Sequence, residues 1–88
     1  MDFLWDEAKN EWLKRDRFIS FEEIAAMIQE GDCIDVIENP ARPGQQCALL
    51  RIRSYIWVIP YVIDEQDRVV LKTAYPSRKY TRIYGDQT

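Results

Sequence analysis

The chain has 88 residues, of which 31% are charged, and its formal net charge at pH 7 is -3. This length predicts a single domain over residues 1–88 with a modest hydrophobic core. No stretch is long and apolar enough to cross a bilayer, and the acidic N-terminal residues do not resemble a basic signal region, so we expect a cytoplasmic protein with no membrane contact.

Charge is divided unevenly along the chain. Residues 1–44 carry five Lys or Arg and eleven Asp or Glu, whereas residues 45–88 carry seven and four. This asymmetry favours an anionic partner for the second half only, although an ordinary mixed surface can give the same count. There is no histidine, and Cys33 and Cys47 match no metal-ligand spacing. We therefore expect no metal site, no cofactor and two reduced cysteines.

The first segment predicts a short strand followed by a helix. Residues 2–5 suit a strand, with aromatic side chains on one face. Asp6 can cap a helix over residues 7–17, which contains many good helix formers. Trp12 and Leu13 are expected to face the core of the protein.

The second helix has the clearer boundaries. Ser20, followed three residues later by Glu23, forms a capping-box pattern ahead of a helix over residues 21–30. Gly31 suits the left-handed conformation that ends many helices. Apolar side chains recur at helical spacing in Ile24, Met27 and Ile28.

The second half of the chain predicts a sheet. Four segments have the composition of strands: residues 33–38, 47–53, 55–63 and 68–75. The last three are joined by connections too short for a crossover, so we expect an antiparallel meander. Pro60 cannot donate a ladder hydrogen bond, so its strand should bulge or have a free edge there. Residues 39–46 should form a loop, and Ser77 can cap a short helical tail over residues 78–84 before a frayed end.

This order of elements predicts an α+β domain. Two N-terminal helices should pack on one face of a mainly antiparallel sheet of four to five strands, and a short C-terminal helical tail should follow. Because side chains alternate along a strand, Val69, Leu71 and Thr73 should share one face, and Val70, Lys72 and Ala74 the other. One face should be apolar, and the other should gather Arg51, Arg53 and Lys72. The expected core comprises Trp12, Ile24, Met27, Ile28, Ile52 and Leu71.

Three short motifs resemble those of the BrnT family, small ribonuclease toxins of bacterial type II toxin–antitoxin pairs. Residues 3–9 (FLWDEAK) resemble its aromatic-x-Trp-Asp-x-x-Lys start, and residues 19–24 (ISFEEI) resemble its Ser-Phe-Glu-Glu helix opening. Residues 76–79 (PSRK) resemble the Pro-Ser-Arg-Lys element after its last strand. The resemblance implies a fold akin to RelE-type ribonucleases and a cognate antitoxin that covers the active surface.

Cleavage of RNA without a metal ion needs a base for the 2′-hydroxyl, positive charge for the transition state and a proton for the leaving oxygen. Without histidine, the catalytic candidates are Arg78 and Lys79, at the start of the last helix, together with Arg51 and Lys72. Candidate RNA contacts are Arg53, Tyr80 and Arg82. Four of these have a structural alternative, because Arg51 and Arg53 can decorate a solvated strand face, Lys72 can extend to water and Tyr80 can pack in the core.

Three functional hypotheses remain open at this point. The first is a toxin that cleaves mRNA as a metal-independent endoribonuclease and forms a homodimer or a hetero-oligomer with its antitoxin. The second is a catalytically inactive domain of the same fold that only binds an antitoxin-like protein. It is favoured by the sequence RDRF at residues 15–18, where many BrnT proteins have Lys-His-Gly, and by the acidic overall charge. The third is a solitary structural domain.

Overall fold

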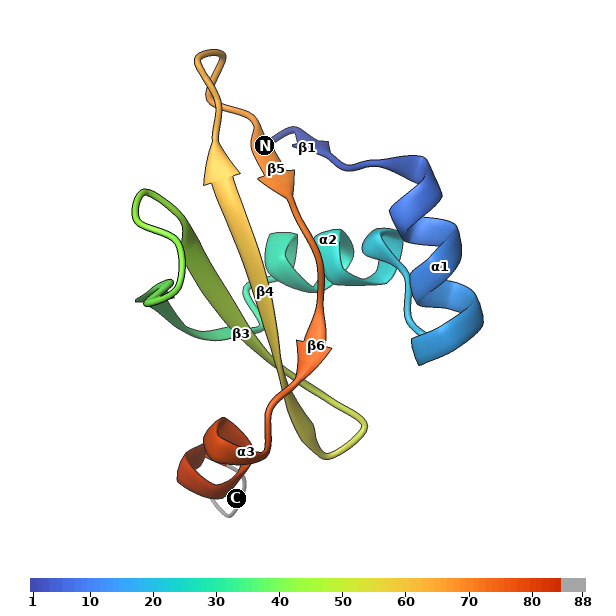
Figure 1. Cartoon of the computed structure of the whole chain (residues 1–88), viewed down its shortest axis with the longest axis vertical. Helices are drawn as coiled ribbons and strands as arrows, with labels where there is room; N and C mark the ends of the chain where they lie inside the picture. The colour runs from blue at the N-terminus through green and yellow to red at the C-terminus, as the bar shows by residue number, and fades with distance from the viewer. Residues whose placement is uncertain (85–88) are drawn as a thin grey trace.

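A six-stranded sheet lies at the centre of the computed structural model, which describes residues 1–84 (Figure 1). Two helices precede the main strands and a short helix follows them, so the predicted α+β class is confirmed. Along the chain the elements are β1 (Phe3–Leu4), α1 (Glu7–Arg17), α2 (Phe21–Gln29), β2 (Cys33–Glu38), β3 (Gln46–Ile52), β4 (Tyr55–Ile63), β5 (Val69–Leu71), β6 (Tyr75–Pro76) and α3 (Arg78–Tyr84). Among these residues, no helix has the length and hydropathy needed to cross a membrane.

The sheet has the spatial order β1-β5-β4-β3-β2, and β6 also pairs with β4. The predicted antiparallel meander is confirmed, since β2 pairs with β3, β3 with β4 and β4 with β5 in that sense. The first strand is shorter than expected and lies parallel to β5, with Phe3 opposite Val69. The sheet is therefore mixed and contains six strands, not the four to five expected.

The predicted strand over residues 68–75 is interrupted, and the reason is Pro60. Residues 61–63 of β4 pair with β5, whereas Trp57 and Val58 pair with β6. Pro60 lies between these two pairings and has no N–H to donate. The Pro60 carbonyl accepts a hydrogen bond from the Lys72 amide at 2.9 Å. The side of β4 on which this carbonyl lies therefore faces the gap between β5 and β6. The ladder is thus interrupted at Pro60, and the expectation of one continuous strand over residues 68–75 is wrong.

The interruption also changes which side chains face the helices. Val69 and Leu71 are buried in the core beneath the helices, as expected. Beyond them, Ala74 joins that core, although strict alternation placed Thr73 on this face and Ala74 on the other. Alternation holds only while the backbone keeps its pleated ladder, and residues 72–74 leave the ladder.

Local capping fixes the helix boundaries. The Asp6 carboxylate accepts a hydrogen bond from the Ala8 amide at 3.0 Å at the start of α1. Ser20 and Glu23 form both halves of the capping box at the start of α2, as predicted. Gly31 follows α2 with a φ of +85°, which is the left-handed conformation expected there.

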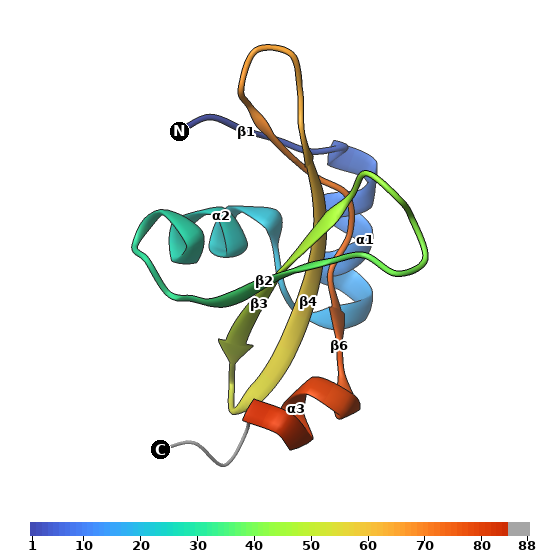
Figure 2. The same ribbon diagram turned by 90° about the vertical axis from the view of Figure 1, so that its left-hand side faces the viewer.

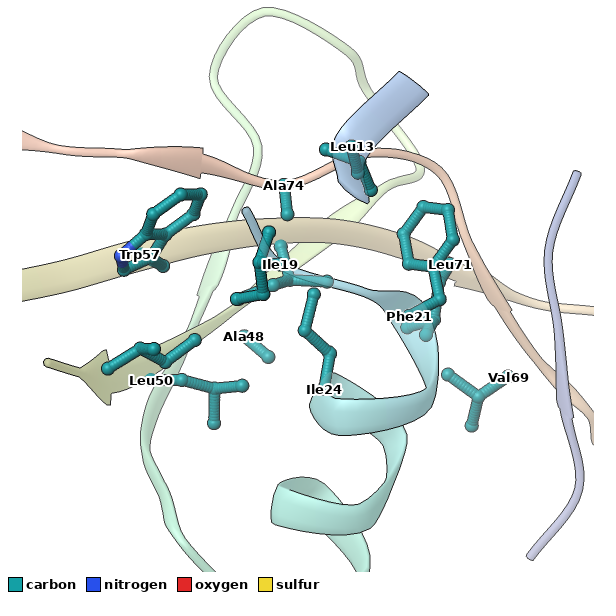
Figure 3. Close-up of a cluster of buried hydrophobic side chains, with 12 residues drawn as sticks. Leu13, Ile19, Phe21, Ile24, Ala48, Leu50, Trp57, Val69, Leu71 and Ala74 are labelled. Carbon is teal, nitrogen blue, oxygen red and sulfur yellow. The ribbon is translucent and has the colours of Figure 1, made fainter. Parts of the chain in front are cut away.

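Both N-terminal helices pack on one face of the sheet and form the main core (Figure 3). Leu13 comes from α1, Phe21 and Ile24 come from α2, and the sheet contributes Leu50, Ile59 and Leu71 among others. Of the six residues expected in the core, Ile24, Ile52 and Leu71 are buried. Trp12, Met27 and Ile28 are only partly buried and pack at its margin, because α1 and α2 are outer layers with one side in water.

The opposite face of the sheet is also apolar, which corrects the expectation of a polar second face. A smaller core forms there from Cys47, Leu49, Ile56 and Val58, with Tyr75, Tyr80 and Tyr84 packed against it. Tyr80 and Tyr84 belong to α3, so the C-terminal helix covers this face as the two N-terminal helices cover the other. Figures 1 and 2 both place α3 at the end of the molecule opposite the β4–β5 hairpin.

Candidate functional site

The structure does not bring Arg51, Arg53 and Lys72 together on one face of the sheet. Arg51 lies on the face covered by α3, and its Nη2 donates to the Tyr84 carbonyl at 2.6 Å. Arg53 lies in the β3–β4 turn with a φ of 54°, and its Nη1 donates to the Phe18 carbonyl at 2.9 Å on the side of the helices. The turn carries Arg53 out of the strand, so the predicted gathering of these three cations is wrong.

Three of the predicted residues lie on α3, and Arg51 reaches the carbonyl of its last residue; we call these four the C-terminal basic patch: Arg51, Arg78, Lys79 and Arg82. All four are exposed. Among residues 1–84, none of them forms an ion pair with a carboxylate. The Lys79 ammonium lies 5.2 Å from the centre of the Tyr80 ring. Within residues 1–84, the patch is therefore an exposed group of cations with no paired carboxylate, and such a group can attract an anion.

Hydrogen bonds fasten α3 to the sheet. The Ser77 hydroxyl accepts from the Tyr80 amide at 3.1 Å, as the predicted cap requires. The Thr81 hydroxyl accepts from the Ile56 amide at 2.8 Å, and the Tyr84 hydroxyl donates to Asp35 at 3.0 Å. The bond to Asp35 raises the pKa of the Tyr84 phenol. These contacts support the structural alternative for Tyr80, whose ring packs on the smaller core.

Lys72 lies elsewhere, in two adjoining hollows between α1, the interrupted strand and the β2–β3 loop. One hollow has a volume of about 360 Å³ and is lined by Lys9, Arg42 and Lys72 with four uncharged residues. The other has a volume of about 400 Å³ and shares Lys9 and Lys72, with Asp6 on its wall. We call the two together the basic hollow. Its cations come from three segments far apart in the sequence.

Sequence reasoning missed two members of the basic hollow and one buried polar residue. From the sequence alone, Lys9 could form an acid–base pair with Glu7 or simply lie at a helix end, neither of which predicts the hollow, and no motif singles out Arg42 in its loop. Asn10 is fully buried in α1, where its side chain bonds the Phe21 amide and the Glu22 carboxylate, at 2.8 Å in each case. The available signal for Asn10 was a polar residue that lies between the apolar residues Ala8 and Trp12 of the predicted helix. The clustering of Lys9 with Arg42 depends on the tertiary fold, so no sequence pattern could show it.

Within residues 1–84, no group of three or more Cys, Asp or Glu side chains is placed to hold a metal ion. The two cysteines are free, and burial raises the pKa of the Cys47 thiol. Comparison with protein-family models gives no match, and comparisons with curated proteins and with solved structures give none either. The resemblance to the BrnT family thus rests on the three sequence motifs.

Proposed function

We propose that this chain is the toxin of a bacterial type II toxin–antitoxin pair and cleaves mRNA as a metal-independent endoribonuclease. The observation that carries the proposal is the C-terminal basic patch, where Arg78, Lys79 and Arg82 are exposed on α3 and Arg51 binds the end of that helix. The PSRK motif of the BrnT resemblance supplies two of these cations. Two N-terminal helices on a sheet, with a short helix after the last strand, accord with the same family.

The reaction balances without an added reagent. The 2′-oxygen of a nucleotide attacks the neighbouring phosphorus while its proton passes to a base, and the bond from phosphorus to the 5′-oxygen breaks as that oxygen takes up a proton. The products are a cyclic phosphate and a 5′-hydroxyl. Arg78 and Lys79 bind the phosphate oxygens and stabilise the extra negative charge of the transition state, with Arg51 beside them. Arg82 and Tyr80 contact the flanking RNA, whereas Arg53 and Lys72 lie outside the patch and contact more distant parts of the strand.

Induced expression in growing bacteria tests the proposal. The wild-type chain should stop growth, and the purified protein should cleave single-stranded RNA in the presence of EDTA. Removal of one transition-state donor costs roughly 10²–10³ in rate. Arg78→Ala and Lys79→Ala should therefore abolish toxicity while leaving the melting temperature nearly unchanged, because both side chains are exposed.

A matched control is Arg15→Ala, which removes the same charge from an exposed position on α1, where Arg15 pairs with its neighbour Asp16 at 3.4 Å. This variant should remain fully toxic. If the wild-type chain neither slows growth nor cleaves RNA, the nuclease proposal fails.

One observation favours a second candidate, a catalytically inactive domain that binds an antitoxin-like protein. Arg51, Tyr80 and Tyr84 are engaged in holding α3 on the sheet, which gives these residues a structural purpose without any chemistry. In that case the chain should bind the product of a neighbouring small reading frame, and both alanine variants should bind it as the wild type does. Growth should then be unaffected by expression of the chain alone.

A further inference from the structure

The basic hollow arises where the sheet is interrupted. Pro60 lacks an N–H, so residues 72–74 leave the ladder between β5 and β6. Helix α1 lies beside this gap, and the β2–β3 loop approaches it from the other side. The result is a recess lined by Lys9 of α1, Arg42 of the loop and Lys72 of the gap.

The charges of the hollow are not compensated. Lys9, Arg42 and Lys72 form no ion pair within residues 1–84. Asp6 is the one carboxylate on the walls of the two hollows, and it already accepts a hydrogen bond from the Ala8 amide at 3.0 Å. Three cations against one carboxylate leave a formal charge of +2 on the lining. Like charges held together in this way repel each other, and a bound anion removes that cost.

Several contacts hold α1 and the loop backbone around the hollow in place. The Lys9 ammonium lies 4.5 Å from the centre of the Trp12 ring, and the Arg17 guanidinium lies 4.6 Å from it. Arg17 in turn donates to the carbonyl of Ala74, which ties α1 to the gap. Hydrogen bonds within the loop hold the backbone beside Arg42, from the Asn39 amide to the Gln45 carbonyl at 3.0 Å and from the Gln45 amide to the Arg42 carbonyl at 3.1 Å. A backbone framework and a Lys9 side chain that are already ordered lower the entropic cost of binding.

We propose that the basic hollow is a binding site for the phosphate group of a nucleotide. A phosphate monoester carries a charge of about -1.5 to -2 near neutral pH, which matches the lining. Arginine and lysine together supply a planar pair of donors and two point charges for its oxygens. The two hollows have volumes of about 360 and 400 Å³. Both volumes lie within the range of small-molecule sites and leave room for more than a bare phosphate. The phosphate can belong to a free nucleotide or be the terminal phosphate of a single strand of RNA.

This site is separate from the C-terminal basic patch, because no residue of α3 lines either hollow. Binding here does not require the chain to cleave RNA. The two proposals can therefore fail independently, since one is tested by toxicity and cleavage and the other by ligand binding to the purified chain.

The test is a titration of the isotope-labelled chain, followed by NMR, with inorganic phosphate, uridine monophosphate and a short single-stranded oligouridylate. All three ligands carry phosphate, and we expect uridine monophosphate to shift the amide signals of Lys9, Lys72 and residues 39–45. Arg42→Gln and Lys72→Gln should each weaken this binding roughly tenfold, the usual worth of one hydrogen bond to a charged group. Arg78→Gln removes the same charge from the C-terminal basic patch and should leave the binding nearly unchanged.

The outcomes separate the sources of the phosphate. Equal or tighter binding of the oligouridylate at the same residues, with an affinity that falls steeply with salt, identifies RNA as the source. Binding of the mononucleotide alone identifies a free nucleotide. The proposal is overturned if phosphate compounds leave these signals unmoved, if Arg42→Gln and Lys72→Gln bind as the wild type does, or if an acidic peptide occupies the hollow in preference to them. Arg42→Gln changes an exposed loop residue, so its spectrum outside residues 39–45 should report an intact fold.

Discussion

At the scale of single residues, Asn10 is the polar side chain on which the packing of the two N-terminal helices depends. Its amide donates to Glu7 at 3.0 Å and to Glu22 at 2.8 Å, and its carbonyl oxygen accepts from the Phe21 amide at 2.8 Å. Asn10 belongs to α1, while Phe21 and Glu22 form the first turn of α2. One buried side chain thus satisfies an orphan amide at the start of α2 and sets the position of that helix against α1.

We expect Asn10→Ala to destabilise the protein by about 2–3 kcal/mol. The substitution leaves the Phe21 amide without its acceptor in a buried place, and an unmet buried donor costs about 1–3 kcal/mol by itself. Urea denaturation followed by circular dichroism measures the loss. An unchanged midpoint would contradict this account of Asn10.

The pH dependence of the same variant is a sharper control. Hydrogen bonds from Asn10 and from the backbone amide of Glu22 hold the pKa of the Glu22 carboxyl below its ordinary value. A lowered pKa in the folded state contributes stability that is present above the ordinary carboxyl pKa and is lost as the pH falls through the lowered one. The part of the pH dependence of stability that comes from Glu22 should be smaller in Asn10→Ala. Lys14→Ala removes a charge near Glu22 but keeps the hydrogen bond from Asn10, so it should retain most of that dependence.

At the scale of elements, α2 is bound to the sheet mainly by two of its side chains. Phe21 and Ile24 are fully buried against the strands, whereas Met27 and Ile28 are partly buried at the edge of the core. The apolar stripe predicted from spacing is therefore real, but its N-terminal half carries most of the contact. Two contacts hold the first turn of α2 in the core. Ile19, in the connection from α1, is buried there, and Asn10 of α1 accepts a hydrogen bond from the Phe21 amide.

Ile24→Ala and Leu71→Ala should each cost about 2–5 kcal/mol, because each truncation leaves a cavity between α2 and the sheet. For a domain of this size that is a large share of the total stability. Ile28→Ala removes a side chain of the same size from the margin and should cost clearly less. Thermal unfolding of the three variants measures the difference, and equal melting temperatures for all of them would show that the core is placed wrongly.

At the scale of the whole molecule, the sheet is covered on both faces but not along its β2 edge. Within the described residues 1–84, β2 pairs with β3 alone, so its other side presents free backbone donors and acceptors there. Val36 on this strand is 45% exposed, and Phe18 and Ile83 are 73% and 52% exposed. Of these three, only Val36 belongs to β2, and an exposed apolar side chain on a free strand edge is typical of surfaces that bind another chain. This edge supports the proposal that the protein works with a partner.

We therefore expect the purified chain to associate with itself in the absence of an antitoxin. Sedimentation velocity over a range of protein concentrations should show a concentration-dependent dimer. Val36→Lys places a charge on the β2 edge and should weaken this association, while Lys14→Glu, a charge change on α1, should not. A monomer at every concentration would argue against the proposal that this protein normally works bound to a partner.

The sequence by itself determined the local elements of this protein. Local caps set the helix ends, because a cap acts within a few residues. Asp6 starts α1, Ser20 and Glu23 start α2, and Gly31 ends it. The α+β class and the antiparallel meander followed from the order of the elements and the short connections between strands. Such features depend on groups close together in the chain, and for that reason they could be predicted.

Only the tertiary structure decided where distant side chains meet. The parallel pairing of β1 with β5, the second core beneath α3 and the separation of Arg51, Arg53 and Lys72 were not predicted. Strict alternation failed where Pro60 interrupts the ladder, and that interruption placed Lys72 beside Lys9 and Arg42. Contacts between remote segments are set by how whole elements pack, and no local rule in a single sequence specifies that packing.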